Sequence, residues 1–300
     1  MATRLRDLRR ADLVPLTALL KRCLDLDRIS EDLVREKVWD DPDYSRHLAT
    51  VAVDGSGELC GFILAVRRSE KRGYIKLLAV APQARRSGVG GWLLDVAHFE
   101  LARMGVTEVR LGESAPNYLW PGLDPRYTEA MLFFENRNYA CIGEVYNLSV
   151  PLKGISFNPT RQLTQPNGDP VILRRAEPAD KPALDGFLDL HWPPWKPELD
   201  RGWRRRPIPI HLAFLGSELL GFAAYDCNNF GTGWFGPMAT TQDWQRKGIG
   251  RELLLYCLID LKAQGLDHAV IPWVGPVGFY NRTVDARIDR VFYRYEKELK

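Results

Sequence analysis

An internal repeat constrains the fold of this chain more than any other feature. The segment Glu-Leu-Cys-Gly-Phe at 58–62 recurs as Glu-Leu-Leu-Gly-Phe at 218–222. Two further motifs, each containing a glycine, recur with the same spacing of 160 residues. The three motifs lie at 58 and 218, at 88 and 248, and at 105 and 265. A constant spacing across separate motifs indicates duplication of a whole domain.

Two copies of one domain are therefore expected, joined by a linker. A chain of 300 residues is too long for one ordinary hydrophobic core and suits two. The stretch from Pro151 to Pro170 contains four prolines and the turn pair Asn167-Gly168, which is a composition typical of a linker. We expect domain one at 1–150, the linker at 151–169 and domain two at 170–300.

Composition and charge exclude several classes of protein. With 45% hydrophobic and 26% charged residues, the chain has the composition of a soluble globular protein. Its net charge of +3 is too small to predict a nucleic-acid-binding face. No apolar run is long enough to span a membrane, and the charged N-terminus does not resemble a signal peptide, so a cytoplasmic location is expected. The five cysteines are scattered without a Cys-x-x-Cys pair, so neither a metal site nor a disulfide framework is predicted.

Hydrophobic periodicity and turn residues predict the same order of elements in each copy, an α/β fold with a mixed (α+β) sheet. A strand and a helix come first, an antiparallel hairpin follows, and a strand then leads through a glycine-rich loop into a helix and a parallel crossover. In the first copy we expect strands at 3–6, 48–53, from 61, 74–80 and 106–111. The helices of this copy are expected from about 12 and at 90–104. In the second copy we expect strands at 171–174, 211–215, from 221, 233–239 and 266–271. The helices of this copy are expected from about 180 and at 250–264.

The glycine-rich loop carries the chemistry of this pattern. It reads Arg-Arg-Ser-Gly-Val-Gly at 85–90 and Gln-Arg-Lys-Gly-Ile-Gly at 245–250. Two glycines let the backbone turn tightly and approach a ligand, and the start of the following helix offers unpaired N–H groups and a positive dipole end. Because Arg86, Arg246 and Lys247 add positive charge, each loop is predicted to bind an anion such as a phosphate.

One such loop also fits a tight structural turn, but two copies in the same strand–loop–helix context favour a ligand site. Neither loop has the Gly-x-Gly-x-x-Gly spacing of a dinucleotide site or the Gly-Lys-Ser/Thr ending of a P-loop, which disfavours those two classes. The pattern instead resembles the [Gln/Arg]-x-x-Gly-x-[Gly/Ala] signature of the GNAT (Gcn5-related N-acetyltransferase) family. The run Val80-Ala81-Pro82 also resembles that family's approach to the loop.

This resemblance covers both copies and implies two tandem GNAT acyl-CoA N-acyltransferase domains with acetyl-CoA as cofactor. It implies that amides of the loops hold the pyrophosphate, while the preceding strand pairs with pantetheine and supplies an oxyanion donor. The residues assigned to the cofactor in the second copy are Met238, Ala239, Thr240, Gln245, Arg246, Lys247, Gly248, Ile249, Gly250 and Arg251. Those in the first copy are Leu78, Ala79, Val80, Arg85, Arg86, Ser87, Gly88, Val89, Gly90 and Gly91.

The resemblance also assigns a catalytic acid. Family members commonly carry a tyrosine on the last helix that protonates the departing CoA thiolate, after an aromatic residue. In the second copy Phe279-Tyr280 fits this pattern, although the Gly-Phe that follows in the family is replaced near Asp285. In the first copy the same position holds Phe134, which has no proton to give. We therefore expect the second copy to be catalytic and the first to be impaired or structural.

The general base is less defined by the sequence. The strand at 233–239 carries no Asp or Glu, so the candidates are Asp226 and His191, each of which also fits ordinary polar surface. An amine that loses its proton easily could instead use a water relay.

Two segments are candidates for shaping an acceptor pocket. His191 to Pro207 contains three tryptophans beside arginines, which fits either stacking of a substrate or an aromatic seal between the copies. The first copy also has an insertion between Gly112 and Phe133, which fits a lid or an interdomain clasp.

The sequence therefore predicts an acetyl-CoA-dependent N-acetyltransferase that acts by direct attack of a small primary amine, such as an amino sugar, aminoglycoside or amino-thiol. The alternatives are a protein or peptide N-acetyltransferase and a non-catalytic acyl-CoA sensor or scaffold. We expect a monomer or homodimer, with no nucleic-acid or membrane partner.

Overall fold

The computed structural model describes residues 3–164 and 168–299. The chain forms two compact units, one made of Met1–Val145 with Val291–Lys300 and the other of Tyr146–Arg290. Part of the predicted linker, residues 165–167 with Asn167, lies outside the described residues. Within the described chain no helix is both long and apolar enough to span a membrane.

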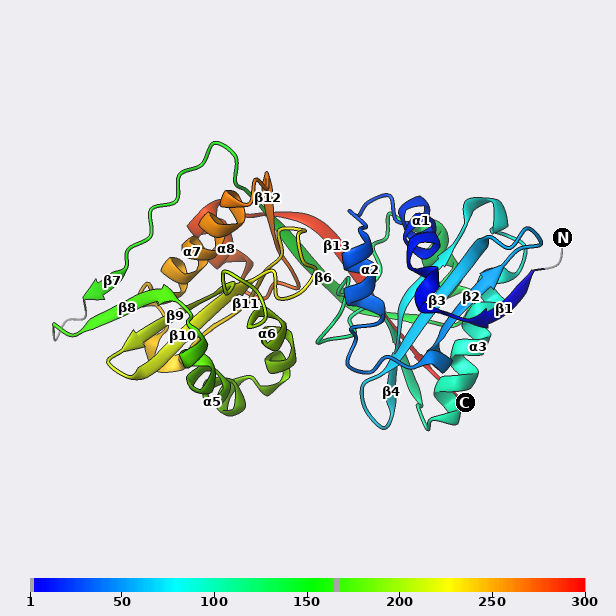
Figure 1. Ribbon diagram of the computed structural model, residues 1–300, viewed down its shortest axis with the longest axis horizontal. Helices are drawn as coiled ribbons and strands as arrows, with labels where there is room; N and C mark the ends of the chain where they lie inside the picture. The colour runs from blue at the N-terminus through cyan, green and yellow to red at the C-terminus, as the bar shows by residue number, and fades with distance from the viewer. Residues whose placement is uncertain (1–2, 165–167, 300) are drawn as a thin grey trace. The chain divides into compact units, whose positions relative to one another are not determined.

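The first unit is built on a mixed sheet with helices on both faces (Figure 1). In hydrogen-bonding order its strands are β1 (Arg4–Asp7), β2 (Ala49–Val53), β3 (Leu59–Arg67), β4 (Arg72–Val80), β5 (Glu108–Leu111) and β13 (Arg287–Glu298). Its helices are α1 (Leu13–Cys23), α2 (Glu31–Val38), α3 (Val89–Arg103) and α4 (Thr128–Glu135). As predicted, β2 and β3 form an antiparallel hairpin and β4 and β5 are parallel.

The second unit repeats this order. Its strands are β7 (Gln162–Thr164), β8 (Pro170–Arg175), β9 (Ile210–Leu215), β10 (Glu218–Tyr225), β11 (Phe235–Thr240) and β12 (His268–Ile271), with β6 (Ala140–Pro151) beside β12. Its helices are α5 (Lys181–His191), α6 (Lys196–Gly202), α7 (Ile249–Ala263) and α8 (Val277–Val284). A parallel bridge between Trp234 and Val270 joins the ends of β11 and β12. The predicted fold, a mixed sheet in two repeats, is confirmed.

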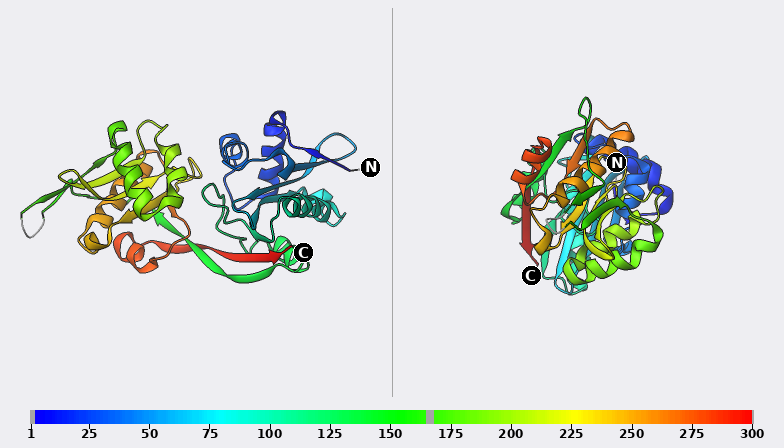
Figure 2. Two further views of the ribbon diagram at one scale, coloured as in Figure 1. Left: turned by 90° about the horizontal axis from the view of Figure 1, so that it is seen from below. Right: turned by 90° about the vertical axis from the view of Figure 1, so that its left-hand side faces the viewer.

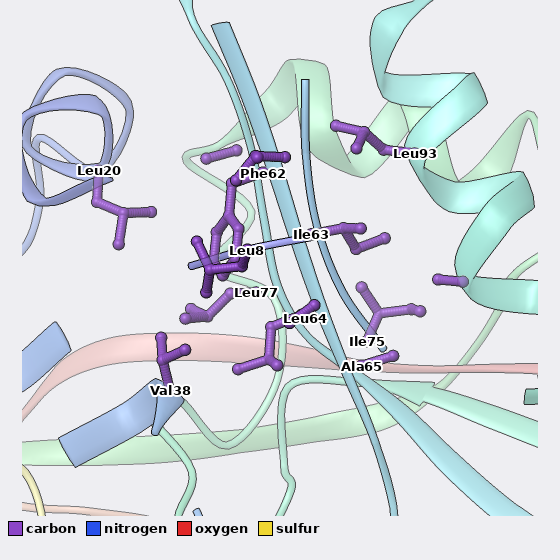
Figure 3. Packing of buried hydrophobic residues seen from close by; sticks show 14 of the residues in the cluster. Leu8, Leu20, Val38, Phe62, Ile63, Leu64, Ala65, Ile75, Leu77 and Leu93 are labelled. Carbon is purple, nitrogen blue, oxygen red and sulfur yellow. The ribbon is translucent and has the colours of Figure 1, made fainter. Parts of the chain in front are cut away.

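Strand β3 is buried on both faces and so forms the centre of the first core. Phe62 and Leu77 lie on the side of α1, where Leu20 packs, whereas Ile63 faces Leu93 of α3 (Figure 3). Figure 2 shows the same layering, with α1 and α2 on one face of the sheet and α3 on the other. The glycine-rich loop connects the end of β4 at Val80 to the start of α3 at Val89.

The start of the first helix in each unit is fixed by the same device. Asp12 accepts two hydrogen bonds from the guanidinium of Arg6, at 2.7 and 2.8 Å, and one from a backbone amide at 2.8 Å. Asp180 accepts the corresponding bonds from Arg174 at 2.6 and 2.8 Å and from an amide at 2.7 Å. Both aspartates stand at the N-cap, as expected, but their side chains do not bond the amides of the helix that follows.

The unit boundaries differ from the expected 1–150 and 170–300 because each sheet takes its last strand from the distant part of the chain. In the first unit, β13 pairs antiparallel with β5 from Glu296 opposite Arg110 onwards, and Tyr295 enters that core, 1% exposed. In the second unit, β6 pairs with β12, with Leu148 opposite Ile271. Local hydrophobic patterns do not reveal such an exchange, because it depends on pairing between residues far apart in sequence.

The segment between β6 and β7 lies along α7 rather than forming a separate linker (Figure 1). Lys262 donates a hydrogen bond to the carbonyl of Ile155. The amide of Thr160 donates to Oε2 of Glu252 at 2.6 Å. Phe157 and Leu163 pack against the core of the second unit.

Candidate active site

The two glycine-rich loops adopt the same backbone conformation. Gly88 has φ 89° and ψ −13°, and Gly248 has φ 88° and ψ −15°. Arg86 and Arg246 both have positive φ, at 62° and 61°, a region that non-glycine residues seldom occupy. The two loops therefore share a conformation that costs free energy, and such strain is often found at ligand sites.

Each loop opens onto an uncapped helix start. Neither Gly88 nor Gly248 contributes a side-chain cap, and the first helical bonds run from the amide of Trp92 to Gly88 at 3.0 Å and from Glu252 to Gly248 at 3.1 Å. The amides of the three residues before each of these donors lie in the first turn and have no intrahelical acceptor. Together with the helix dipole they form a site for an anion.

The strand before the loop in the first unit parts from its neighbour. The pairing of β4 with β5 ends at Ile75 opposite Leu111, and Lys76 is skipped in the pairing with β3, which places a bulge there. From Lys76 to Val80 the edge of β4 is therefore left without β5.

A cavity of about 1010 Å³ occupies this opening. Eight of the residues assigned to the cofactor line it, namely Leu78, Ala79, Val80, Arg85, Arg86, Gly88, Gly90 and Gly91. The other two have structural contacts, since Ser87 donates a hydrogen bond to the carbonyl of Ala84 at 2.7 Å and Val89 is buried in the core.

The second unit has the same order of strand, loop and helix, but its strand contains a proline. Pro237 stands where the first unit has Leu77, so β11 lacks one backbone donor there. Met238 and Ala239 pair with β10, and the methyl carbon of Met238 would lie 3.3 Å from a β-carbon on Gly250.

The remaining residues assigned to the cofactor in the second unit follow that strand. Thr240 ends β11, opposite Gly221. Gln245 leads the exposed part of the loop, and Lys247 lies 4.2 Å over the ring of Trp244. Ile249 is buried, and Arg251 forms an ion pair with Glu252.

A buried charge cluster that the sequence reading missed lies beside the cavity. Lys76 and Asp41 are both fully buried and form an ion pair. Arg68 donates two further hydrogen bonds to Asp41 at 2.6 and 2.7 Å. Burial lowers the pKa of the Lys76 amine to about 7. Burial alone would raise the pKa of Asp41, but its bonds to Arg68 and the charge of Lys76 outweigh it and hold that pKa below its ordinary value. A lysine inside an otherwise apolar strand was the available clue.

The last helix of each unit packs on the second glycine of its loop. Phe133 of α4 lies 3.4 Å from the position of a β-carbon on Gly90, and Phe279 of α8 lies 3.8 Å from that on Gly250. The residue that follows is therefore equivalently placed in the two units, and it is Phe134 in one and Tyr280 in the other. The sequence pairs the same two residues, because each follows the corresponding phenylalanine.

Tyr280 is 7% exposed, and its ring meets that of Phe235 edge-on at 6.2 Å. Phe235 begins β11 and follows Trp234, which forms the parallel bridge to Val270 of β12. Burial raises the pKa of the Tyr280 hydroxyl well above its ordinary value. No hydrogen bond engages this hydroxyl among the described residues, so a protonated donor is available to a ligand.

The two candidate bases lie at the ends of different elements of the second unit. Asp226 follows β10 with φ 50° and is 1% exposed, and its carboxylate accepts the amide of Gly231 at 3.3 Å. His191 is exposed at the end of α5, where its ring contacts Phe187 and Trp192. Phe187, which the ring of His191 contacts, belongs to one core cluster of the second unit, whereas Tyr280 belongs to the other. No group of three or more His, Cys, Asp or Glu side chains in the described part of the chain is arranged to hold a metal.

The two segments expected to shape a pocket have distinct places. Trp192 and Trp195 stack at 5.7 Å and pack on Phe222 of β10, which makes this an aromatic cluster of the second unit's own core. The insertion lines the first unit's cavity. Its Trp120 donates a hydrogen bond to Asp27 at 3.0 Å, and its Leu123 exchanges two backbone bonds of 2.8 Å with Tyr293.

Comparison with known proteins agrees with this architecture. The model of the acetyltransferase (GNAT) family matches residues 13–118 and 175–281. The chain therefore belongs to the acetyltransferase (GNAT) family, in two tandem copies, and is an acyl-CoA-dependent acyltransferase. A comparison with curated proteins finds no match.

Three solved structures show the same fold over 99% of this chain. One is the GCN5-related glucosamine N-acetyltransferase region of a fungal multi-domain GH3 β-N-acetylglucosaminidase, with a TM-score of 0.78 and 18% identity; this chain covers 38% of that protein. A GCN5-related N-acetyltransferase from Sphaerobacter thermophilus has a TM-score of 0.71, 17% identity and 95% coverage. A tandem GNAT protein from the clavulanic acid biosynthesis pathway has a TM-score of 0.71, 13% identity and 98% coverage.

Proposed function

We propose that this protein is an acetyl-CoA-dependent N-acetyltransferase that acetylates the primary amine of a small molecule. The observation that carries the proposal is the repeated loop, which presents uncapped amides beside the end of a strand. Bound there, acetyl-CoA supplies an acetyl group activated as a thioester. The loop amides are the ligands proposed for its diphosphate, and the unpaired edge of the strand is the proposed partner of its pantetheine arm.

Tyr280 is proposed as the catalytic acid. Its hydroxyl keeps its proton at neutral pH because burial disfavours the phenolate. Its place on α8, fixed to the loop through Phe279, keeps the hydroxyl beside Phe235 at the start of β11. It can therefore donate to the sulfur that leaves when the amine has attacked.

The acceptor amine must lose a proton, and this cost limits the choice of substrate. Deprotonating an amine with a pKa near 10.4 at pH 7 costs about 4.6 kcal/mol, whereas an amine with a pKa near 8 costs only about 1–1.5 kcal/mol. Asp226 is retained as the candidate base, through water, whereas His191 is exposed at the end of α5. We propose weakly basic amines first, with glucosamine among them because one protein of the same fold is named for it.

A second role is favoured for the first unit. It has a cavity at its loop, but Phe134 cannot donate a proton. We therefore propose that the first unit binds acyl-CoA without catalysis and that the second unit carries out the transfer.

Thiol release from acetyl-CoA in the presence of a panel of amines tests the activity. Amino sugars, amino-thiols, aminoglycosides and a lysine-containing peptide should be compared at pH 7.5. Turnover on a small amine is the expected result. Acetyl-CoA binding without turnover on any amine would favour a sensor, and turnover only on the peptide would favour a protein acceptor.

A further inference from the structure

The two units differ in where an arginine stands near the first turn of the loop helix. The position of Gly91 in the first copy is that of Arg251 in the second, 160 residues later. Phe133 and Phe279 both pack on the loop glycine and can be used to align the two copies. In this alignment Arg137 corresponds to Thr283, since each lies four residues after its phenylalanine. One copy therefore has glycine on the helix and arginine opposite it, and the other has arginine on the helix and threonine opposite it.

In the first unit the guanidinium of Arg137 fills the space above Gly91. A β-carbon on Gly91 would collide with Nη2 of Arg137. The guanidinium also stacks on the ring of Phe133 at 4.0 Å, which fixes its plane. Both Gly91 and Arg137 line the cavity.

Arg137 has no carboxylate partner among the described residues, and it is half-buried beside a positive helix end. Arg85, the nearest loop arginine with a partner, pairs instead with the exposed Glu129 at 2.8 Å. An unpaired guanidinium against the positive end of a helix is unfavourable unless an anion lies between them.

In the second unit the corresponding charge is already neutralised. Arg251 pairs with Glu252, which is 4% exposed. The other oxygen of Glu252 accepts the amide of Thr160 at 2.6 Å. Trp92 occupies the position of Glu252 in the first copy, so no carboxylate is available there.

We propose that Arg137 binds the diphosphate of acyl-CoA in the first unit, opposite the amides of α3. This inference rests on the proposed acyl-CoA binding and assigns a residue outside the loop motif to it. The planar, stacked guanidinium offers two parallel N–H groups to phosphate oxygens, which an amine at the same place does not. The first unit consequently has a stronger anion site than the second.

Methionine methyl NMR separates the two units in the full chain. Met131 lies on α4 of the first unit and Met238 on β11 of the second, beside Gly250. Titration of acetyl-CoA into the wild type and Arg137→Gln should show ~10- to 100-fold weaker binding at Met131, since one charge-assisted contact is lost. Binding at Met238 should not change. Arg137→Lys should fall between the two.

Truncated ligands identify the group that Arg137 contacts. With acetyl-dephospho-CoA, which keeps the diphosphate but lacks the 3′-phosphate, the effect of Arg137→Gln should persist. With acetyl-pantetheine, which has no phosphate, wild type and variant should bind equally. An equal loss with acetyl-pantetheine would show that Arg137 only supports the fold, and an effect that disappears with acetyl-dephospho-CoA would move the contact to the 3′-phosphate; either overturns the proposal.

Moving the arginine from position 137 to position 91 tests whether a guanidinium on the helix can restore the binding that is lost without Arg137. Arg137→Thr alone should bind as weakly as Arg137→Gln. Gly91→Arg combined with Arg137→Thr reproduces the arrangement of the second unit without a carboxylate in the position of Glu252, and it should restore affinity to within a few-fold of wild type. No rescue in a folded double variant would contradict the proposal. If wild type itself shows no shift at either methionine with any acyl-CoA, the proposed function fails; if wild type and Arg137→Gln bind alike, only this inference fails.

Discussion

The ring of Phe279 lies against Gly250, with its Cζ 3.8 Å from the place of a β-carbon on that glycine. A helix is thereby fixed to the loop through one aromatic contact, and the next residue, Tyr280, is held beside Phe235 at the start of β11 by core packing. The position of its hydroxyl depends on the hydrophobic core and not on a hydrogen bond to the protein.

Tyr280→Phe should lower kcat by ~100-fold, because a positioned acid contributes on the order of 10²–10⁴ to the rate. The affinity for acetyl-CoA should stay within two-fold (roughly 0.4 kcal/mol), since the ring is retained. Thiol release and calorimetry on the same preparations measure the two quantities. Tyr256→Phe, on α7, is the matched control and should change neither. An unchanged kcat in Tyr280→Phe would remove this residue from the mechanism.

The left-handed glycines of the loops should each resist substitution. Gly88→Ala and Gly248→Ala should lower the free energy of unfolding by about 1–2 kcal/mol, because both have φ near 90° although little or nothing crowds the added methyl group. Gly186→Ala is the control. Nothing lies within 4 Å of a β-carbon there and α5 continues through it, so this change should add up to about 1 kcal/mol. Equal effects of the three variants in chemical denaturation would refute this account of the loop.

The buried amine of Lys76 should make the free energy of unfolding depend on pH between about 7 and about 10.4. Burial lowers its pKa to about 7 in the folded protein, whereas the unfolded chain has a value of about 10.4. Between these values the unfolded state binds more protons, so the stability that this group contributes rises with pH and is lost as pH falls through 7. The free energy of unfolding of wild type minus that of Lys76→Met should rise by up to about 1.4 kcal/mol per pH unit in this window. A difference that stays flat or falls with pH would show that the carboxylate of Asp41 keeps the amine charged in spite of burial and of the nearby charges of Lys37 and Arg68.

The exchanged strand should decide whether the first unit folds alone. A fragment of residues 3–145 leaves the edge of β5 unpaired and removes Tyr295 from the core, so it should be aggregation-prone and lack a cooperative thermal transition. The same fragment joined to residues 291–299 by a flexible linker should regain both β13 pairing and a cooperative transition. Sedimentation and calorimetry compare the two, and equal stability of both fragments would mean that β13 contributes nothing to this core.

Much of each unit followed from the sequence because its elements are locally encoded. The helix expected at 90–104 is α3 at Val89–Arg103, and Gly105 and Gly265 end their helices with φ 83° and 80°, as C-terminal glycines do. The loop residues could be proposed from the sequence because glycine spacing, positive charge and a helix start follow one another in the chain.

The parts that sequence could not supply depend on distant residues. Neither β6 nor β13 was predicted, because their partners in the sheets lie more than a hundred residues away. The Lys76–Asp41 pair joins a strand to the segment after α2, and only folding makes it visible. Arg137 escaped the motif because it reaches the loop from another helix end.

Since residues 291–299 complete the sheet of the first unit, a ribosome must synthesise the entire second unit before the first can close. The earlier half of the nascent chain has to wait with one sheet edge exposed, for about ten seconds or more at the usual rate of elongation. The second unit, which ends at Arg290, can therefore finish folding before the first, so the folding order is expected to run against the order of synthesis.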